Sequence, residues 1–262
     1  MLSEKRQSTK ITVTDAPIQS QRGYDISNSM SREYYQNKEY SKERVLQGPH
    51  CGPLDRSVAS PRNPIKAGGK ALAEQANVAV EADISRLFAE TKSAFGTLDV
   101  LINNAGIYEF SPLEGITPEH FHKHFDLNVL GLLLTTREAA KLFPSNGGSI
   151  INISSGVSTM TPPNTAVYSA TKAAVDAITG SLSKELAPRK IRVNSVNPGM
   201  IETEGVKAAG MHEGDMRKWI ESVTPLGRIG LTTEIAPAVV FLASDDSSYI
   251  TGETLHITGG LH

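Results

Sequence analysis

A doubly wound α/β fold with a parallel sheet is predicted for most of this 262-residue chain. Two observations predict it. From residue 64 onward, short apolar runs alternate with segments of helical periodicity, which is the pattern of βα units. Polar or glycine-containing turns follow three of these apolar runs, at the positions where open α/β sheets bind ligands. The length fits one large domain of this kind.

Residues 1–63 do not share this pattern. Ile, Leu, Val and Phe make up nine of these residues, about 14%, which is below the ~20% at which chains struggle to build a core. Ten basic and seven acidic residues give the segment a charge of +3, although the whole chain carries −2. We expect it to be mostly disordered or loosely docked, with a short edge strand at 10–14.

The first regular elements follow this segment. Residues 71–80 are expected to form a strand and its exit loop, and 99–103 a short buried strand. Between them, Asp83 is the expected N-cap of a helix. That helix places four apolar residues on one face: Ile84, Leu87, Phe88 and Phe95.

The second half continues the alternation. Thr117 opens a long helix with Pro118 in its first turn, and 148–153 is the next strand. A helix that ends before Pro188 is expected to bury Val175, Ile178, Leu182 and Leu186. The last elements are expected to be a strand, a helix and a strand, at 191–196, 233–242 and 253–257.

Composition excludes several function classes. The net charge of −2 gives no indication of nucleic-acid binding. The single cysteine, Cys51, cannot form an internal disulfide, which fits a reducing compartment. We expect no signal peptide, because the polar start has no apolar stretch behind it, and no membrane span, because no apolar run approaches ~18 residues. A cytoplasmic protein is expected.

Tyr168 and Lys172 are the main candidates for chemistry, because their spacing places them on one helix face. A tyrosine has a pKa near ~10, so work as a base near neutral pH needs a shift of roughly 3 units, or about 4 kcal/mol. A nearby cation in a dry cleft can supply much of that shift. Ser155 precedes Tyr168 by thirteen residues and can hold the substrate oxygen.

Asn128 lies on the apolar face of its helix, in line with Phe121, Phe125 and Leu132. A buried amide must find hydrogen-bond partners, so Asn128 is either a satisfied core residue or the anchor of a bound water. The turns at 103–106, at Ser155 and at 198–199 follow separate strands. We therefore expect their polar groups to converge at one edge of the sheet.

Three histidines suggest a metal site, but none is expected. His120 and His124 share a helix face, while His122 points away and no third ligand is apparent. A solvated histidine-rich turn is the preferred interpretation. Glu234 is interpreted as a first-turn charge that the helix dipole favours.

Together these residues resemble the short-chain dehydrogenase/reductase family over 64–262. The resemblance rests on Asn103-Asn-Ala-Gly106, Asn128, Ser155, Tyr168-x-x-x-Lys172, Asn197-Pro-Gly199 and the terminal Thr251-Gly-Glu-Thr. Residues 197–205 and 224–230 are similar to the bacterial glucose 1-dehydrogenase and 3-oxoacyl-carrier-protein reductase subgroup. The resemblance implies a Rossmann-like fold and hydride transfer between NAD or NADP and a secondary alcohol or ketone, with NADP slightly favoured.

The resemblance also implies roles. Tyr168 is the general acid or base, Lys172 lowers its pKa, Ser155 holds the substrate oxygen and Asn128 anchors a proton-relaying water. Residues 203–223, with Trp219, form a substrate lid. The implied partners are a small carbonyl or alcohol substrate and further copies of the chain, in a homotetramer or dimer built through the helices that start at Thr117 and Tyr168. The implied cofactor-binding residues are Asn77, Val78, Asn103, Ala105, Gly106, Tyr168, Lys172, Pro198, Gly199, Ile201 and Thr203.

The chain departs from the family at its N-terminal side. The family's glycine-rich turn, Thr-Gly-x-x-x-Gly-x-Gly, is absent from 1–70, and Asn77 stands where the family has Asp. We therefore expect the N-terminal βαβ unit, with its central strand and phosphate cradle, to be missing or divergent. Two origins remain open, a divergent N-terminus or an incorrect gene start, skipped exon or frame slip before Ile65. The alternative to an enzyme is a non-catalytic or truncated chain with impaired cofactor binding.

Overall fold

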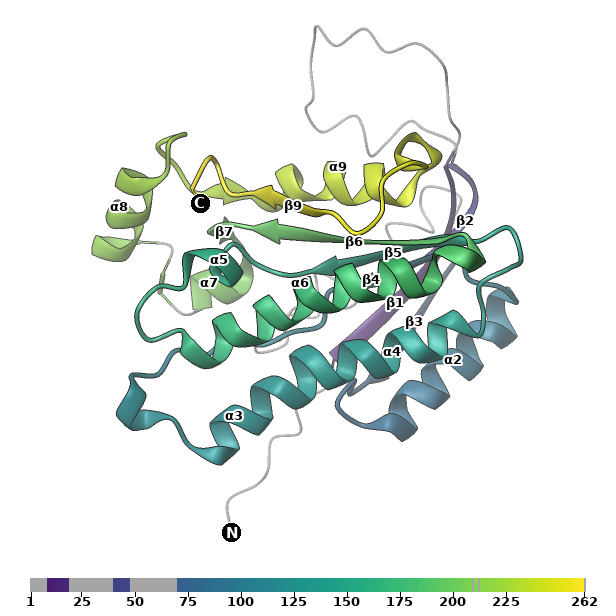
Figure 1. Cartoon of the computed structure of the whole chain (residues 1–262), viewed down its shortest axis with the longest axis horizontal. Helices are drawn as coiled ribbons and strands as arrows, with labels where there is room; N and C mark the ends of the chain where they lie inside the picture. Colours follow the sequence, from purple (N-terminus) through teal and green to yellow (C-terminus); the bar gives the residue numbers. More distant parts are fainter. Residues whose placement is uncertain (1–8, 19–39, 48–69, 209, 212, 262) are drawn as a thin grey trace, which may run out of the picture.

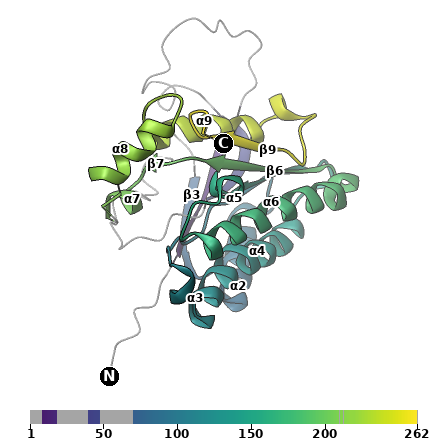
Figure 2. The same ribbon diagram turned by 60° about the vertical axis from the view of Figure 1, so that its left-hand side comes forward.

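The computed structural model describes residues 9–18, 40–47, 70–208, 210–211 and 213–261. Within them, a seven-stranded sheet has the order β3-β1-β2-β4-β5-β6-β9. Helices α2, α4 and α6 cover one face of this sheet and α9 covers the other (Figures 1 and 2). The strands are β1 (Thr9–Ile18), β2 (Tyr40–Gln47), β3 (Lys70–Ala76), β4 (Val100–Asn103), β5 (Gly148–Ile153), β6 (Ile191–Pro198) and β9 (Thr254–Ile257).

The part of the sheet from β2 to β9 is parallel, as predicted. β4 pairs with β2 and β5, and β6 pairs with β5 and β9, all in parallel register. Parallel strands need crossover connections, which the helices supply. The carboxyl ends of β4, β5 and β6 therefore meet at one edge of the sheet, where the candidate site lies.

The N-terminal part of the sheet is built differently. β1 runs antiparallel to both β2 and β3, so it forms no βαβ unit with either of them. This confirms the prediction of a divergent N-terminal unit. Two expectations are corrected. The strand expected at 10–14 lies inside the sheet rather than at its edge, and β2 occupies the position beside β4, where a strand was expected to be absent. The rest of 1–63, and the boundary near residue 64, lie outside the described residues.

The helices predicted from the sequence are present, with small differences at their ends. The longer ones are α2 (Glu81–Phe95), α3 (Pro118–Phe125), α4 (Gly131–Ala140), α6 (Ala166–Leu186), α8 (Gly214–Val223) and α9 (Thr232–Ala243). A π-helical turn, Asp126–Leu130, joins α3 to α4, so the helix that starts after Thr117 is long, as predicted. Short elements complete the chain: α5 (Val157–Met160), α7 (Glu204–Ala208), β7 (Ile201–Glu202) and β8 (Gly230–Leu231).

The core has one cluster on each face of the sheet, because successive strand residues point to opposite sides. Leu101 packs with Ile84, Leu87 and Ile150 beneath α2, and its neighbours on β4 pack beneath α9. The second cluster contains Val100, Ile102, Ile151, Val196 and Leu242. No helix among the described residues combines the length and apolar character needed to cross a bilayer.

Two local predictions about helix residues are wrong. The N-cap of α2 is Val80, and Asp83 lies inside the first turn, where its carboxylate accepts a hydrogen bond from Asn77 N–H at 2.8 Å. On α6, Val175 and Leu186 are buried as predicted, but Ile178 and Leu182 are only half-buried. The face of α6 turned to the sheet follows the spacing Thr171, Val175, Thr179 and Ser183, which are all buried.

Candidate active site

The predicted convergence of polar groups is present at the carboxyl edge of the parallel strands. Ser155 lies just beyond β5, and Tyr168 and Lys172 lie one turn apart on α6. Asn128 lies in the π-helical turn between α3 and α4. Three separate chain segments therefore bring the four predicted catalytic residues to one end of the sheet.

The Ser155 hydroxyl lies close enough to Tyr168 to influence its pKa. Desolvation raises the pKa of Tyr168 to about 12, and the hydrogen bond from Ser155 opposes that change. The sequence-based expectation of a lowered pKa is therefore wrong for this structure. The physical reason is burial, which disfavours the charged phenolate. The Lys172 Nζ lies 5.9 Å from the tyrosine ring centroid and donates to Ile153 O at 2.9 Å.

Lys172 is only 7% exposed, and its environment is unusual for an amine. Burial lowers the pKa of Lys172 to about 8, while the nearby Asp176 carboxylate acts in the opposite direction. An ammonium has three N–H donors, and Ile153 O accepts one of them. Lys172 can thus hold a hydroxyl-bearing ligand with its other donors.

Asn128 joins the loop after β4 to helix α6. Its Oδ1 accepts from Ile107 N–H at 2.9 Å, and its Nδ2 donates to Ile107 O at 2.9 Å and to Thr171 Oγ1 at 3.1 Å. Asn128 is only 2% exposed. Its hydrogen bonds therefore agree with the interpretation of Asn128 as a core amide whose polar groups are satisfied. A water-relaying role remains a prediction.

Gly106 places open backbone directly against this group. A Cβ at Gly106 would lie 3.4 Å from Asn128 Oδ1 and 3.6 Å from Lys172 Nζ. A side chain there would cover the ammonium. The absence of one keeps Lys172 approachable from the end of β4, as the family resemblance implies for a cofactor-binding glycine.

The other predicted cofactor-binding residues at the ends of β4 and β6 also make contacts that stabilise the fold. Asn103 Nδ2 donates to Thr136 Oγ1 and Asn152 Oδ1, both at 2.9 Å, so its amide fastens the end of β4. A Cβ at Gly199 would lie 2.9 Å from Thr258 Cα, which explains the need for glycine. Pro198 O accepts from Gly156 N–H at 2.8 Å.

The remaining predicted residues lie on the loops after β3, β4 and β6. Asn77 Oδ1 accepts from Ala79 N–H at 3.0 Å, and Val78 is buried beside Gly131. Thr203 Oγ1 accepts from Val206 N–H at 3.2 Å and so starts α7. Ala105 is half-buried on the loop after β4, and Ile201 is half-buried at the start of β7. Thus Asn77 and Thr203 are tied into their own turns.

Asp176 was missed by the sequence reasoning. It lies one turn beyond Lys172 on α6, and its Oδ2 accepts from Asn197 Nδ2 at 2.9 Å. The signal was available, because Tyr168, Lys172 and Asp176 repeat every fourth residue and share a helix face. Asp176 ties that face to β6.

An aromatic cluster beside Tyr168 was also missed. The ring centroids of Tyr108 and Phe110 each lie 6.2 Å from that of Tyr168. A Cβ at Gly205 would lie 2.8 Å from Tyr108 Oη, so α7 packs on this cluster. The predicted lid residues 203–223 thus begin next to Tyr168, and Trp219 on α8 is 54% exposed.

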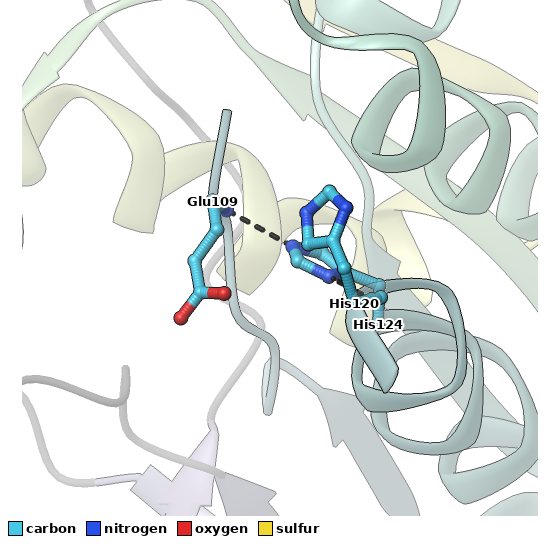
Figure 3. Close-up of side chains that lie close together, drawn as sticks. All are labelled: Glu109, His120 and His124. Carbon is cyan, nitrogen blue, oxygen red and sulfur yellow. Dashed lines mark hydrogen bonds between the residues drawn. The ribbon is translucent and has the colours of Figure 1, made fainter. Parts of the chain in front are cut away.

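The histidines of α3 differ in their exposure to solvent. His124 is fully buried, whereas the side chain of His122 is 67% exposed and lies 3.8 Å from Asp126. Glu109, from the loop after β4, lies beside His120 and His124 (Figure 3). The interpretation of a solvated histidine-rich turn is therefore wrong for His124, because tertiary packing covers it. Elsewhere, Glu234 does lie in the first turn of α9, where its pKa is lowered to about 2 by Arg228 and by Leu231 N–H.

Comparison with known proteins places this arrangement among enzymes. Residues 55–262 match the family described as enoyl-(acyl carrier protein) reductase. An uncharacterised oxidoreductase of Methylorubrum extorquens is 50% identical over 195 residues, covering 74% of this chain and 78% of that protein. A 3-oxoacyl-(acyl-carrier-protein) reductase of Staphylococcus aureus is 39% identical over 200 residues, covering 76% and 80%.

Solved structures give the same result. A short-chain dehydrogenase/reductase from Serratia marcescens is similar with a TM-score of 0.74 and 33% identity, over 80% of this chain and 84% of that one. A gluconate 5-dehydrogenase from Burkholderia cenocepacia, in complex with NADP and tartrate, is similar with a TM-score of 0.67 and 34% identity, over 71% and 72%.

Proposed function

The chain belongs to the short-chain dehydrogenase/reductase family, and from this premise we propose that it transfers a hydride between NAD(P) and a secondary alcohol or ketone. The observation that carries the proposal is the grouping of Ser155, which acts on the pKa of Tyr168, with Tyr168 and the buried Lys172 amine one helical turn away. A proton donor, an oxygen-holding hydroxyl and a ribose-binding ammonium are the groups that this reaction requires.

In the reductive direction, Tyr168 gives its proton to the substrate oxygen while Ser155 hydrogen-bonds the same oxygen. The raised pKa of Tyr168, about 12, keeps the phenol protonated at neutral pH. A bound nicotinamide ring supplies or accepts the hydride. In the oxidative direction Tyr168 must accept a proton, and a group with so high a pKa is seldom deprotonated at neutral pH.

The residues present fit the nicotinamide end of the cofactor. Gly106 leaves Lys172 open, and Lys172 has donors available for the ribose hydroxyls. We propose that the predicted set holds NAD(P), with NADP slightly favoured: Asn77, Val78, Asn103, Ala105, Gly106, Tyr168, Lys172, Pro198, Gly199, Ile201 and Thr203. The NADP complex of the Burkholderia relative supports a nicotinamide dinucleotide.

The pyrophosphate end does not fit as well. The sequence contains no Thr-Gly-x-x-x-Gly-x-Gly turn before residue 70, and β1 is antiparallel to its neighbours. This observation favours a second candidate function, a non-catalytic family member, or a truncated chain, that keeps the fold but binds cofactor poorly. We expect cofactor affinity to be weak.

The proposed setting follows from the sequence and the surface. We propose a cytoplasmic homo-oligomer, a tetramer or dimer, that acts on a small carbonyl or alcohol and binds neither nucleic acid nor membrane. Phe121 on α3, Leu130 in the π-helical turn and Leu133 on α4 are exposed apolar residues that association through this long helix would cover.

The test is a fluorescence titration of the full chain with NADH and NADPH, followed by a search for ketone reduction with the bound cofactor. Saturable binding and turnover support the enzyme. No saturable binding below millimolar concentrations contradicts it, and a cooperative thermal melt in that case supports the non-catalytic member over an unstable fragment.

A further inference from the structure

A compact group of metal-ligating side chains lies apart from the proposed catalytic residues. His120 and His124 are one turn apart on α3, and Glu109 approaches them from the loop after β4 (Figure 3). One donor atom from each of the three lies within 4.8 Å of the others. The imidazole rings meet edge to face, with their centroids 4.6 Å apart.

His124 is held as a neutral imidazole in one orientation. Its Nε2 accepts from Glu109 N–H at 3.0 Å, so this nitrogen carries a lone pair. Its Nδ1 therefore bears the proton and donates to His120 O at 2.9 Å. Metal-bound histidines have the same arrangement, with the second ring nitrogen fixed by a backbone carbonyl.

His120 supplies the observation that a ligand explains. Both of its ring nitrogens are buried, and neither has a hydrogen-bond partner among the residues that the structure describes. A buried polar atom without a partner costs roughly 1–3 kcal/mol, so such atoms are rare. A cation bound to one nitrogen would remove that cost.

We propose that Glu109, His120 and His124 bind a divalent transition-metal cation of the zinc type. Two imidazoles and one carboxylate are a common zinc ligand set that leaves a fourth position for water. With bonds of ~2.0–2.1 Å, tetrahedral ligands stand about 3.4 Å apart, so donors up to 4.8 Å apart must approach by up to about 1.4 Å. Glu109 can make this approach, because its side chain is 46% exposed.

Two existing contacts compete with the cation. Lys123 forms an ion pair with the Glu109 carboxylate, and Glu109 N–H donates a hydrogen bond to His124 Nε2. Binding weakens the ion pair and must break the bond from Glu109 N–H, which moves the backbone of the loop after β4. That loop carries Tyr108, which contacts Tyr168, so a bound cation also braces the wall beside the proposed proton donor.

The test is titration of the full chain, in buffer without chelator, with Co²⁺ by absorption and with Zn²⁺ by calorimetry. We expect one equivalent to bind, with the strong visible bands of four-coordinate Co²⁺. Removing one ligand in Glu109→Gln or His120→Asn should weaken binding at least about tenfold. His122→Asn is the matched control on the same helix and should bind as the wild type does.

A third variant gives an effect of opposite sign. Lys123→Met frees the Glu109 carboxylate and removes a positive charge, so it should tighten metal binding several-fold. This change corresponds to the ~0.2–1 kcal/mol that an exposed ion pair contributes. No binding up to millimolar metal, or equal loss in His122→Asn, overturns the proposal. If His120→Asn fails to fold by circular dichroism, the exposed Glu109→Gln decides: unchanged affinity there overturns the proposal.

Discussion

The two halves of the sheet differ in direction and in what they can bind. From β4 to β9 the strands are parallel, and their carboxyl ends carry Ser155 and face Tyr168 and Lys172 on α6. On the other side, β1 runs against β2 and β3. The site for proton transfer and the cradle for cofactor phosphates are therefore separable, because they depend on different halves.

The parallel half holds its geometry through buried polar bonds. Asn152 accepts from Asn103 and donates to Thr179, both at 2.9 Å, which joins β4, β5 and α6. Asn197 joins β6 to α6 through Asp176. Buried amides with full sets of partners fix strand ends more rigidly than apolar contacts alone. These bonds hold together the ends of β4, β5 and β6 and the helix that carries the catalytic pair.

The largest expected effect lies in the parallel half. Tyr168→Phe removes the proton donor and should lower the rate of ketone reduction by about 10²–10⁴-fold. Affinity for NADPH should change little, because Lys172 and Gly106 remain. The measurement is single-turnover reduction at saturating cofactor, together with a fluorescence titration. A parallel loss of cofactor affinity would assign Tyr168 a structural role instead.

The next effect lies in the N-terminal half. A chimera in which residues 1–69 are replaced by a family segment with the strand and glycine-rich turn should bind NADPH about 10²-fold more tightly, since two charge-assisted hydrogen bonds to phosphate contribute about 3 kcal/mol together. Its rate at saturating cofactor should equal that of the native chain. If the chimera gains no affinity, the two halves are not separable in this way.

Lys172 predicts a pH dependence of stability. Its folded pKa, about 8, is below the ordinary value of 10.5, so the unfolded chain binds more protons between these values and stability rises with pH there. From pH 7 to pH 9.5, Lys172 should raise the free energy of unfolding by about 2 kcal/mol. Tyr168 acts in the opposite sense only above its ordinary value of 10.0.

Urea unfolding at both pH values measures this contribution, with Lys172→Met as the reference. Between pH 7 and pH 9.5, the free energy of unfolding of the wild type should rise by about 2 kcal/mol more than that of the variant. Equal gains in the two proteins would show that the amine is not desolvated as the structure indicates.

The smallest effect belongs to an exposed charge of the same parallel half. Glu234 pairs with Arg228 and accepts from Leu231 N–H, but both side chains are largely exposed. Glu234→Gln should therefore cost no more than about 1 kcal/mol at pH 7. Because the folded pKa of Glu234 is about 2, its contribution is present above its ordinary value of 4.5 and is lost as pH falls through 2. A larger cost in thermal melts at pH 7 would contradict this.

The predictability of the molecule follows the same division. In the parallel half, apolar runs such as 148–153 and helix signals such as Thr117 predicted the elements, because these signals are local. The direction of β1 could not be predicted, since strand pairing depends on distant residues. The pKa of Tyr168 was predicted in the wrong direction because the burial of its phenol depends on tertiary packing, which the helix spacing does not show.

The missed neighbours of the site have the same explanation. Asp176 was visible as a helix repeat, but Tyr108 and Glu109 reach the site only through the fold of the loop after β4. Sequence spacing identified His120 and His124 as neighbours, and only the tertiary structure brings the Glu109 carboxylate close to them.

The most direct test of the proposed chemistry is one turnover of a ketone by the native chain with saturating NADPH, compared with Tyr168→Phe at equal cofactor occupancy. We predict one equivalent of alcohol formed for each NADPH consumed by the native chain, and a rate at least about 10²-fold lower in the variant. Equal rates in the two proteins for every ketone tried would contradict the assignment of Tyr168 as the proton donor.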